Sequence, residues 1–88
     1  MAAPITLYDA THLSGAATYI VLDTPGVLHS VVVNTAGTSV TIYDNTAGSG
    51  TVIAVIGAVT GPFTYDVQLV KGLTLVIAGA ADVTVLTT

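Results

Sequence analysis

The segment Phe63-Thr-Tyr-Asp-Val-Gln-Leu-Val70 decides the fold class, because its large apolar side chains alternate with mostly polar ones. Successive side chains of a β-strand point to opposite faces, so this period of two predicts a strand with one buried face. Lys71-Gly72 interrupts the pattern, and Leu73–Ala78 then repeats it with Leu and Ile side chains on one face. The two segments together indicate β-structure in this part of the chain.

Segments of the same kind recur along the rest of the chain. Val, Ile and Thr fill most of them, whereas Glu and Arg are absent and Lys and Gln occur once each, so β-structure is favoured over helix. We expect strands at Ile5–Asp9, Thr18–Asp23, Val27–Asn34, Ser39–Asp44, Thr51–Ile56, Phe63–Val70, Leu73–Ala78 and Asp82–Leu86. Their spacing predicts a single all-β domain over residues 1–88, a compact antiparallel β-sandwich or jelly-roll-like barrel of about eight short strands.

Turn-forming residues separate these segments. Pro25-Gly26 suits a tight turn, because Pro presets φ and Gly accepts positive φ. Asn34-Thr-Ala-Gly37 separates two strands that we expect to form a hairpin, and Asn45–Gly50 is expected to do the same for the next pair. Pro cannot sit in a central strand, so Gly61-Pro62 is placed at the start of one. We also expect a short turn of helix around His12–Ala16.

The composition restricts the class of function. Only 7% of the residues are charged and 52% are apolar, with one Lys and a net charge of −4, whereas an ordinary chain is roughly 25% charged. A single cation provides no basic patch for nucleic-acid phosphates or for anionic membrane surfaces, so neither partner is expected. No run reaches the roughly 18 apolar residues of a transmembrane helix, and the start of the chain lacks the positive region of a signal peptide.

Two segments are apolar on both predicted faces, Val31–Val33 and Val52–Ile56. In a two-layer sandwich the outward face of each sheet is expected to be exposed to solvent. A second apolar face therefore predicts that another surface, most simply that of a neighbouring subunit, packs against it. We therefore expect a homo-oligomer, a trimer being favoured, with the candidate interface residues Val27, His29, Val31, Val32, Val33, Ile53 and Val55. The alternatives are a monomer coated with hydroxyl groups and a cover formed by loops of the same chain.

The acidic residues and histidines do not form a recognisable motif. The five acidic residues favour turn and solubility roles over a Ca²⁺ site, because no Asp-x-Asp spacing occurs among Asp9, Asp23, Asp44, Asp66 and Asp82. His12 and His29 lack the spacing of a zinc site. A structural or interface role is expected for His29, which lies in the most apolar segment and could act as a pH-sensitive contact.

Three other patterns could be mistaken for functional sites. Asp9, His12 and Ser14 lie close in sequence, but Ser14 is not in a nucleophile elbow, so a catalytic triad is not expected. Gly48-Ser49-Gly50 lacks the Lys and the following helix of a phosphate-binding loop. A sugar-stacking platform is a weaker interpretation than core or interface positions for Tyr8, Tyr19, Tyr43 and Tyr65. The sequence therefore predicts no enzyme activity, no catalytic residue, no metal and no cofactor.

Three stretches resemble small virion proteins of tailed bacteriophages. They are Gly26-Val-Leu-His-Ser-Val-Val-Val-Asn-Thr-Ala-Gly37, Val40-Thr-Ile-Tyr-Asp-Asn-Thr-Ala47, and Gly72-Leu-Thr-Leu-Val-Ile-Ala-Gly79 followed by Ala81-Asp-Val-Thr-Val85. The likeness is to the capsid decoration (cement) class and to related head-fibre and tail modules. Members of that class are often compact β-sandwiches or jelly rolls that sit as trimers at capsid three-fold positions.

The resemblance implies a function without catalysis. It implies a decoration protein that binds the outer shell and stabilises contacts between major capsid subunits, with the major capsid protein as partner. It also implies a location on the capsid surface of a virion assembled in the host cytoplasm. The alternatives are a head-fibre or tail adhesin module and a small carbohydrate-binding domain.

Overall fold

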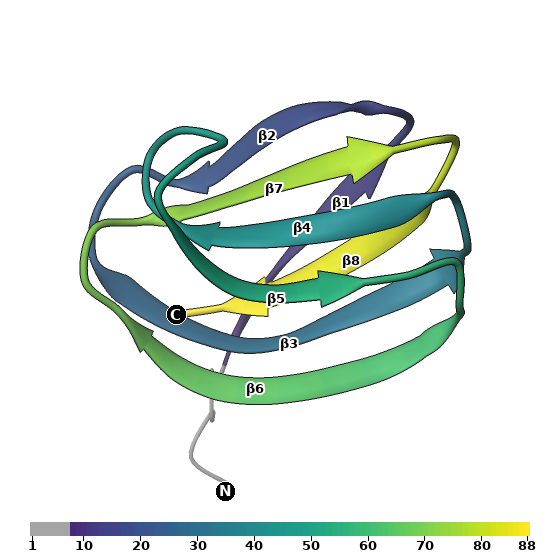
Figure 1. The fold of residues 1–88 in the computed structure, drawn as a ribbon. Helices are drawn as coiled ribbons and strands as arrows, with labels where there is room; N and C mark the ends of the chain where they lie inside the picture. Colours follow the sequence, from purple (N-terminus) through teal and green to yellow (C-terminus); the bar gives the residue numbers. More distant parts are fainter. Residues whose placement is uncertain (1–7) are drawn as a thin grey trace, which may run out of the picture.

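The computed structural model describes residues 8–88 and is all-β over that range. Its strands are β1 (Asp9–Ser14), β2 (Ala17–Leu22), β3 (Gly26–Thr35), β4 (Ser39–Asp44), β5 (Thr51–Ile56), β6 (Gly61–Leu69), β7 (Leu73–Ala78) and β8 (Asp82–Thr87). They form two four-stranded antiparallel sheets, β1-β8-β3-β6 (sheet A) and β2-β7-β4-β5 (sheet B), which lie face to face (Figure 1). The predicted β-sandwich of about eight strands is therefore confirmed.

The strand order is that of a jelly roll. The chain behaves as one long hairpin whose paired arms are β4 with β5, β3 with β6, β2 with β7 and β1 with β8. Rolling this hairpin places successive pairs alternately in sheet B and sheet A, and the pairings β3·β8 and β4·β7 then complete each sheet. Every connection except β4–β5 consequently crosses between the sheets, the double Greek-key connectivity of jelly rolls.

Alternation along the strands places the core between the two sheets. In β8 the odd-numbered residues are buried and the even-numbered ones are partly exposed, as the period-two pattern requires. The buried apolar residues are Leu13, Leu28, Val31, Val33, Val40, Ile42, Ile56, Leu69, Leu73, Leu75, Ile77, Ala81, Val83 and Val85. At roughly 1.5–3 kcal/mol for each fully buried large aliphatic side chain, this layer is the main source of stability.

Two predictions about the local structure are wrong, and a third falls mostly outside the described residues. Of the predicted strand Ile5–Asp9 only Tyr8 and Asp9 are described, and the first described strand begins at Asp9. The turn of helix predicted at His12–Ala16 is wrong, because β1 runs to Ser14 and a tight turn then leads into β2. The hairpin predicted across Asn34–Gly37 is also wrong, since β3 and β4 belong to different sheets. The hairpin across Asn45–Gly50 is confirmed.

Bulges interrupt three of the four edge strands. Val21 is an extra residue in β2 against β7, and Ile53 is one in β5 against β4. In β6, Tyr65 and Asp66 together face the single residue His29 of β3, and Asp66 takes the left-handed conformation at φ 51°. Aspartate tolerates this conformation better than most residues do. The bulges twist these edges and turn selected side chains outward.

Candidate interaction surfaces

The seven predicted interface residues divide between the core and the surface. Val31 and Val33 are 0% and 3% exposed and belong to the core, so they do not reach the outer surface of this chain. Val27, His29 and Val32 are half-buried on β3, and Ile53 is half-buried at the bulge of β5. Val55 is the most accessible of the set, with an exposed fraction of 63%.

The bulge in β5 explains why this strand is apolar on its outer side. Val55 pairs with Thr41 and Val52 pairs with Tyr43, on the outward-facing rows of sheet B. In a regular strand, Val52 and Val55, which are three residues apart, would lie on opposite faces. With the extra residue Ile53, both face solvent and are 49% and 63% exposed. The outer apolar face predicted for this segment is therefore present, and its geometry depends on the bulge.

The β4–β5 loop covers part of the outer face of sheet B. The Thr74 hydroxyl on β7 donates a hydrogen bond of 2.9 Å to the carbonyl oxygen of Asn45, and Thr74 is fully buried. A Cβ atom on Gly48 would lie 2.8 Å from a methyl carbon of Val76 and 3.4 Å from one of Thr18. A loop of the same chain therefore covers the β7 part of this face, whereas the β5 part stays open.

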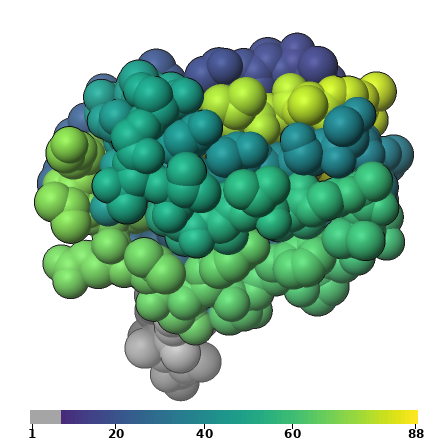
Figure 2. Space-filling view, viewed as in Figure 1, coloured from purple at the N-terminus to yellow at the C-terminus, as the bar shows by residue number. Residues whose placement is uncertain are grey.

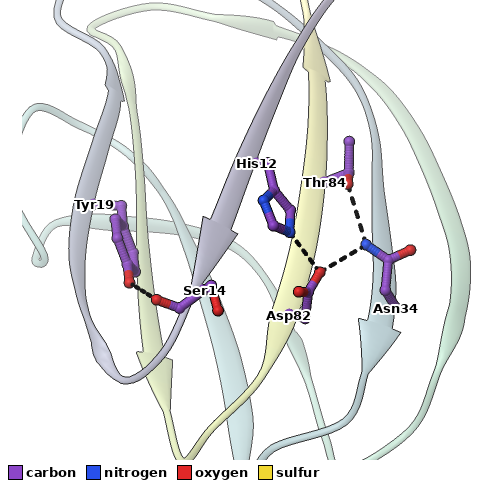
Figure 3. Close-up of polar contacts among 6 residues, drawn as sticks. All are labelled: His12, Ser14, Tyr19, Asn34, Asp82 and Thr84. Atoms are coloured by element: carbon purple, nitrogen blue, oxygen red, sulfur yellow. Dashed lines mark hydrogen bonds and ion pairs between the residues drawn. The ribbon is translucent and has the colours of Figure 1, made fainter.

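A polar cluster lies at one end of the outer face of sheet A (Figure 3). His12 on β1 contacts the Asp82 carboxylate on β8 through Nε2 at 2.7 Å, and the Asn34 amide on β3 donates to the same carboxylate at 3.0 Å. The Asn34 amide also donates to the hydroxyl of Thr84 at 3.2 Å. The hydrogen bonds from Asn34 and His12 lower the pKa of Asp82 below its ordinary value, so this carboxylate is charged at neutral pH.

A second histidine–carboxylate pair lies on the same sheet. His29 on β3 contacts the Asp66 carboxylate on β6 through Nδ1, at the place where both strands bulge. The Tyr8 ring stacks on the imidazole with a centroid distance of 3.9 Å and an interplanar angle of 5°. Each histidine therefore pairs with one carboxylate on the surface of sheet A, His12 with Asp82 and His29 with Asp66.

Asp44 at the end of β4 has a different role, because its carboxylate binds the turn between β6 and β7. The backbone N–H groups of Val70, Lys71 and Gly72 donate to it, with the shortest contact at 2.9 Å. These hydrogen bonds, the one from Val70 first, lower the pKa of the Asp44 carboxyl below its ordinary value. The turn-forming role predicted for this aspartate is confirmed, and it links strands of both sheets.

The four tyrosines do not gather on one surface. Tyr19 donates to the backbone carbonyls of Ser14 and Gly15 at 2.6 and 3.0 Å and so closes the β1–β2 turn. Tyr65 packs against the core, where burial raises the pKa of its hydroxyl. Tyr8 lies on the outer side of sheet A, whereas Tyr43 lies on sheet B. They form no common stacking platform for a sugar.

The candidate triad residues do not come together. His12 contacts Asp82, and the backbone carbonyl of Ser14 accepts a hydrogen bond from Tyr19, so Asp9, His12 and Ser14 do not form a triad (Figure 3). Residues 8–88 enclose no pocket and hold no group of three or more His, Cys, Asp or Glu side chains placed to bind a metal ion. The outer faces of the two sheets differ in chemistry. Sheet A carries both histidine–carboxylate pairs, and sheet B exposes apolar residues.

Comparison with protein-family models, with curated proteins and with solved structures finds no match to this chain. Within residues 8–88, no helix is long and apolar enough to cross a membrane.

Proposed function

We propose that this chain is a non-enzymatic capsid decoration (cement) protein of a tailed bacteriophage, which binds the outer shell and stabilises contacts between major capsid subunits. The observation that carries the proposal is the poverty of charge beside exposed apolar side chains. The chain has one basic and five acidic residues, and apolar side chains lie on the outer faces of both sheets. Val27 and Val32 are half-buried on sheet A, and Ile20, Val52 and Val55 are 58%, 49% and 63% exposed on sheet B. Surfaces of this kind mark sites that another protein covers.

Cementing requires no chemistry beyond contact area. A standard protein interface buries about 800 Å² on each partner. A small protein that touches two coat subunits must be detached before those subunits separate, so its binding free energy adds to the work of opening the shell. A rigid β-sandwich suits this role, because little conformational entropy is lost when preformed strands dock. The proposed homo-oligomer, a trimer, would multiply the number of coat subunits held by one particle.

The outer face of sheet A is the proposed contact with the major capsid protein. Val32 lies in a cross-strand row with Thr84 and His12, and the pair His29–Asp66 lies on the same sheet. Stable interfaces combine an apolar centre with surrounding hydrogen-bonding groups that fix orientation. The half-buried Val32 of β3 lies between these two polar sites and would form such a centre, with the half-buried Val27 on the other side of His29.

The test is reconstitution on undecorated shells assembled from a major capsid protein. Wild-type protein is expected to sediment with the shells and to raise the temperature at which they open. The Val32→Asp variant would bury an unpaired carboxylate in the contact, which costs several kcal/mol and lowers affinity by at least about 100-fold. Ala80→Asp adds the same charge at the exposed β7–β8 turn and is expected to bind like wild type.

Failure of the wild-type protein to bind the shell, or binding without added heat resistance, would reject the cement function. The head-fibre or tail adhesin module would then be the better proposal, since it places the same surfaces against other virion proteins. The carbohydrate-binding alternative has less support, because Tyr8 and Tyr43 lie on different sheets.

A further inference from the structure

Three exposed valines lie on β5 and in the loop that follows it. Val52 and Val55 lie on β5, Val59 lies in the loop to β6, and their exposed fractions are 49%, 63% and 51%. We call these three residues the β5 patch. The surface over β5 and the following loop faces the viewer in Figure 2, coloured teal to green. The β4–β5 loop, which covers part of β7, leaves these side chains open.

The sequence segment around the β5 patch carries no charge. The chain has no charged residue between Asp44 and Asp66. The carboxylate of Asp44 is held by backbone N–H groups at one end of β5, and that of Asp66 pairs with His29 on sheet A. A chain with a net charge of −4 repels a second copy of itself. Two copies therefore meet at lower electrostatic cost where charged residues are few, as they are on the side that carries the β5 patch.

The edges beside the patch disfavour association by strand addition. β5 carries the bulge at Ile53, and the neighbouring edge strand β6 carries Pro62 and the bulge at Tyr65–Asp66. Bulges and proline on edge strands are known devices against edge-to-edge pairing. Association on this side therefore proceeds by packing of side chains, for which Val52, Val55 and Val59 already point outward.

The β5 patch is expected to be buried against another protein before any shell is present. Thr51–Ile56 is a six-residue, uncharged, proline-free strand rich in Val and Ile, which is the signature of an aggregation-prone segment when left exposed. A coat lattice covers it only after assembly, whereas another copy of the chain is available from synthesis onward. On this argument we infer that the β5 patch is the self-association surface of this protein, occupied by a second copy and not by the coat protein.

The exposed surface extends beyond the three valines. Eight of the residues from Thr51 to Phe63 are exposed, and a standard interface buries ~800 Å² on each partner. The adjoining outward residues Thr41 and Tyr43 of β4 are partly exposed and extend the surface. The inference deepens the proposed homo-oligomer and leaves the outer face of sheet A for the shell.

The natural chain has no cysteine, so single thiols report the contact cleanly. Val55→Cys places a thiol in the patch, and Ile20→Cys places a matched one on β2 at the opposite edge of sheet B, where Ile20 is 58% exposed. Alkylation by iodoacetamide is measured as protein concentration rises from nanomolar to high micromolar. The Val55→Cys thiol is expected to become several-fold slower to react, and the Ile20→Cys thiol to react at a constant rate.

Other labelling patterns would overturn the inference. They are constant rates for both thiols, equal slowing of both, slowing of Ile20→Cys alone, and slowing of Val55→Cys only after shells are added, which would make the coat protein the occupant. A second measurement avoids the question of folding. Val52→Thr with Val55→Thr keeps β-forming, near-isosteric side chains, and is expected to shift sedimentation equilibrium toward the 8.8 kDa monomer, with Ile20→Thr as control.

Shell binding separates the two proposals. A wild-type monomer that still decorates shells would overturn the self-association surface and leave the cement function standing. A wild-type oligomer that is dispersed by the paired Val→Thr changes, yet binds no shell, would support the surface and reject the cement function.

Discussion

Replacement of Asp44 by Ala tests how much the hydrogen bonds to the β6–β7 turn, which crosses between the two sheets, stabilise the fold. The Asp44 carboxylate accepts hydrogen bonds from the backbone N–H groups of Val70, Lys71 and Gly72. A hydrogen bond to a buried charged group contributes about 1.5–3 kcal/mol, but this site is half-exposed and water replaces part of the loss. Removal of a comparable carboxylate from a helix N-cap costs about 0.5–2 kcal/mol. We therefore expect Asp44→Ala to lower the free energy of unfolding by about 1–3 kcal/mol.

Thermal unfolding followed by far-UV circular dichroism measures this loss. For a domain of this size each kcal/mol corresponds to a fall of about 4–8 °C in Tm, so Asp44→Ala is expected to melt roughly 5–20 °C below wild type. Asp44→Asn keeps one neutral acceptor oxygen and is expected to fall between the two. Asp23→Ala removes an exposed carboxylate in the β2–β3 turn and serves as the matched control, with little change expected.

The same pair of proteins gives a pH signature. The pKa of Asp44 is lowered in the folded state from the ordinary value of 3.8, so the unfolded chain takes up the proton more readily. The stabilising contribution is therefore complete above the unfolded pKa and is lost as the pH falls through the folded pKa. The difference between wild type and Asp44→Ala is expected to be constant near neutrality and to shrink below about pH 4. Equal stability at pH 7, or a difference that does not shrink in acid, would refute the role assigned to this carboxylate.

Two further substitutions test the core and one strained turn. Leu75→Ala removes a fully buried side chain of β7 and is expected to lower the free energy of unfolding in urea by about 2–5 kcal/mol; a loss no larger than that of Val52→Ala, which is half-exposed, would contradict the proposed core. Gly79→Ala places a Cβ 2.6 Å from a backbone nitrogen at φ +80° and is expected to cost about 1–3 kcal/mol, whereas Gly57→Ala meets no atom within 4 Å of the described structure and is expected to be nearly neutral in the same assay.

The fold class and most strand positions could be predicted from local pattern. The bounds of β4, β5 and β7 agree with the prediction, because β-branched residues and the period of two are local properties of the chain. The sheet to which each strand belongs could not be predicted from the local sequence. The segments Asn34–Gly37 and Asn45–Gly50 both begin with Asn-Thr-Ala-Gly, yet one crosses between the sheets and the other closes a hairpin. The difference follows from how the whole hairpin rolls up, which no four-residue motif encodes.

The surfaces were harder to predict than the core. Val31 and Val33 were assigned to an interface because Val31–Val33 is apolar on both faces, but only Val32 of the three points outward. The outward direction of both Val52 and Val55 depends on the bulge at Ile53, and nothing in a run of uncharged β-formers marks where an extra residue is inserted. The histidine pairs were missed for a similar reason, since His12 and Asp82 are separated by 70 residues in sequence.

Electron cryo-microscopy of shells mixed with an excess of wild-type protein tests the central claim most directly. The account predicts added density at symmetric positions on the outside of the shell, bridging neighbouring coat subunits and fitted by the eight-stranded sandwich with sheet A toward the shell. Shells that remain bare at saturating protein, or density confined to a tail or a single vertex, would contradict it.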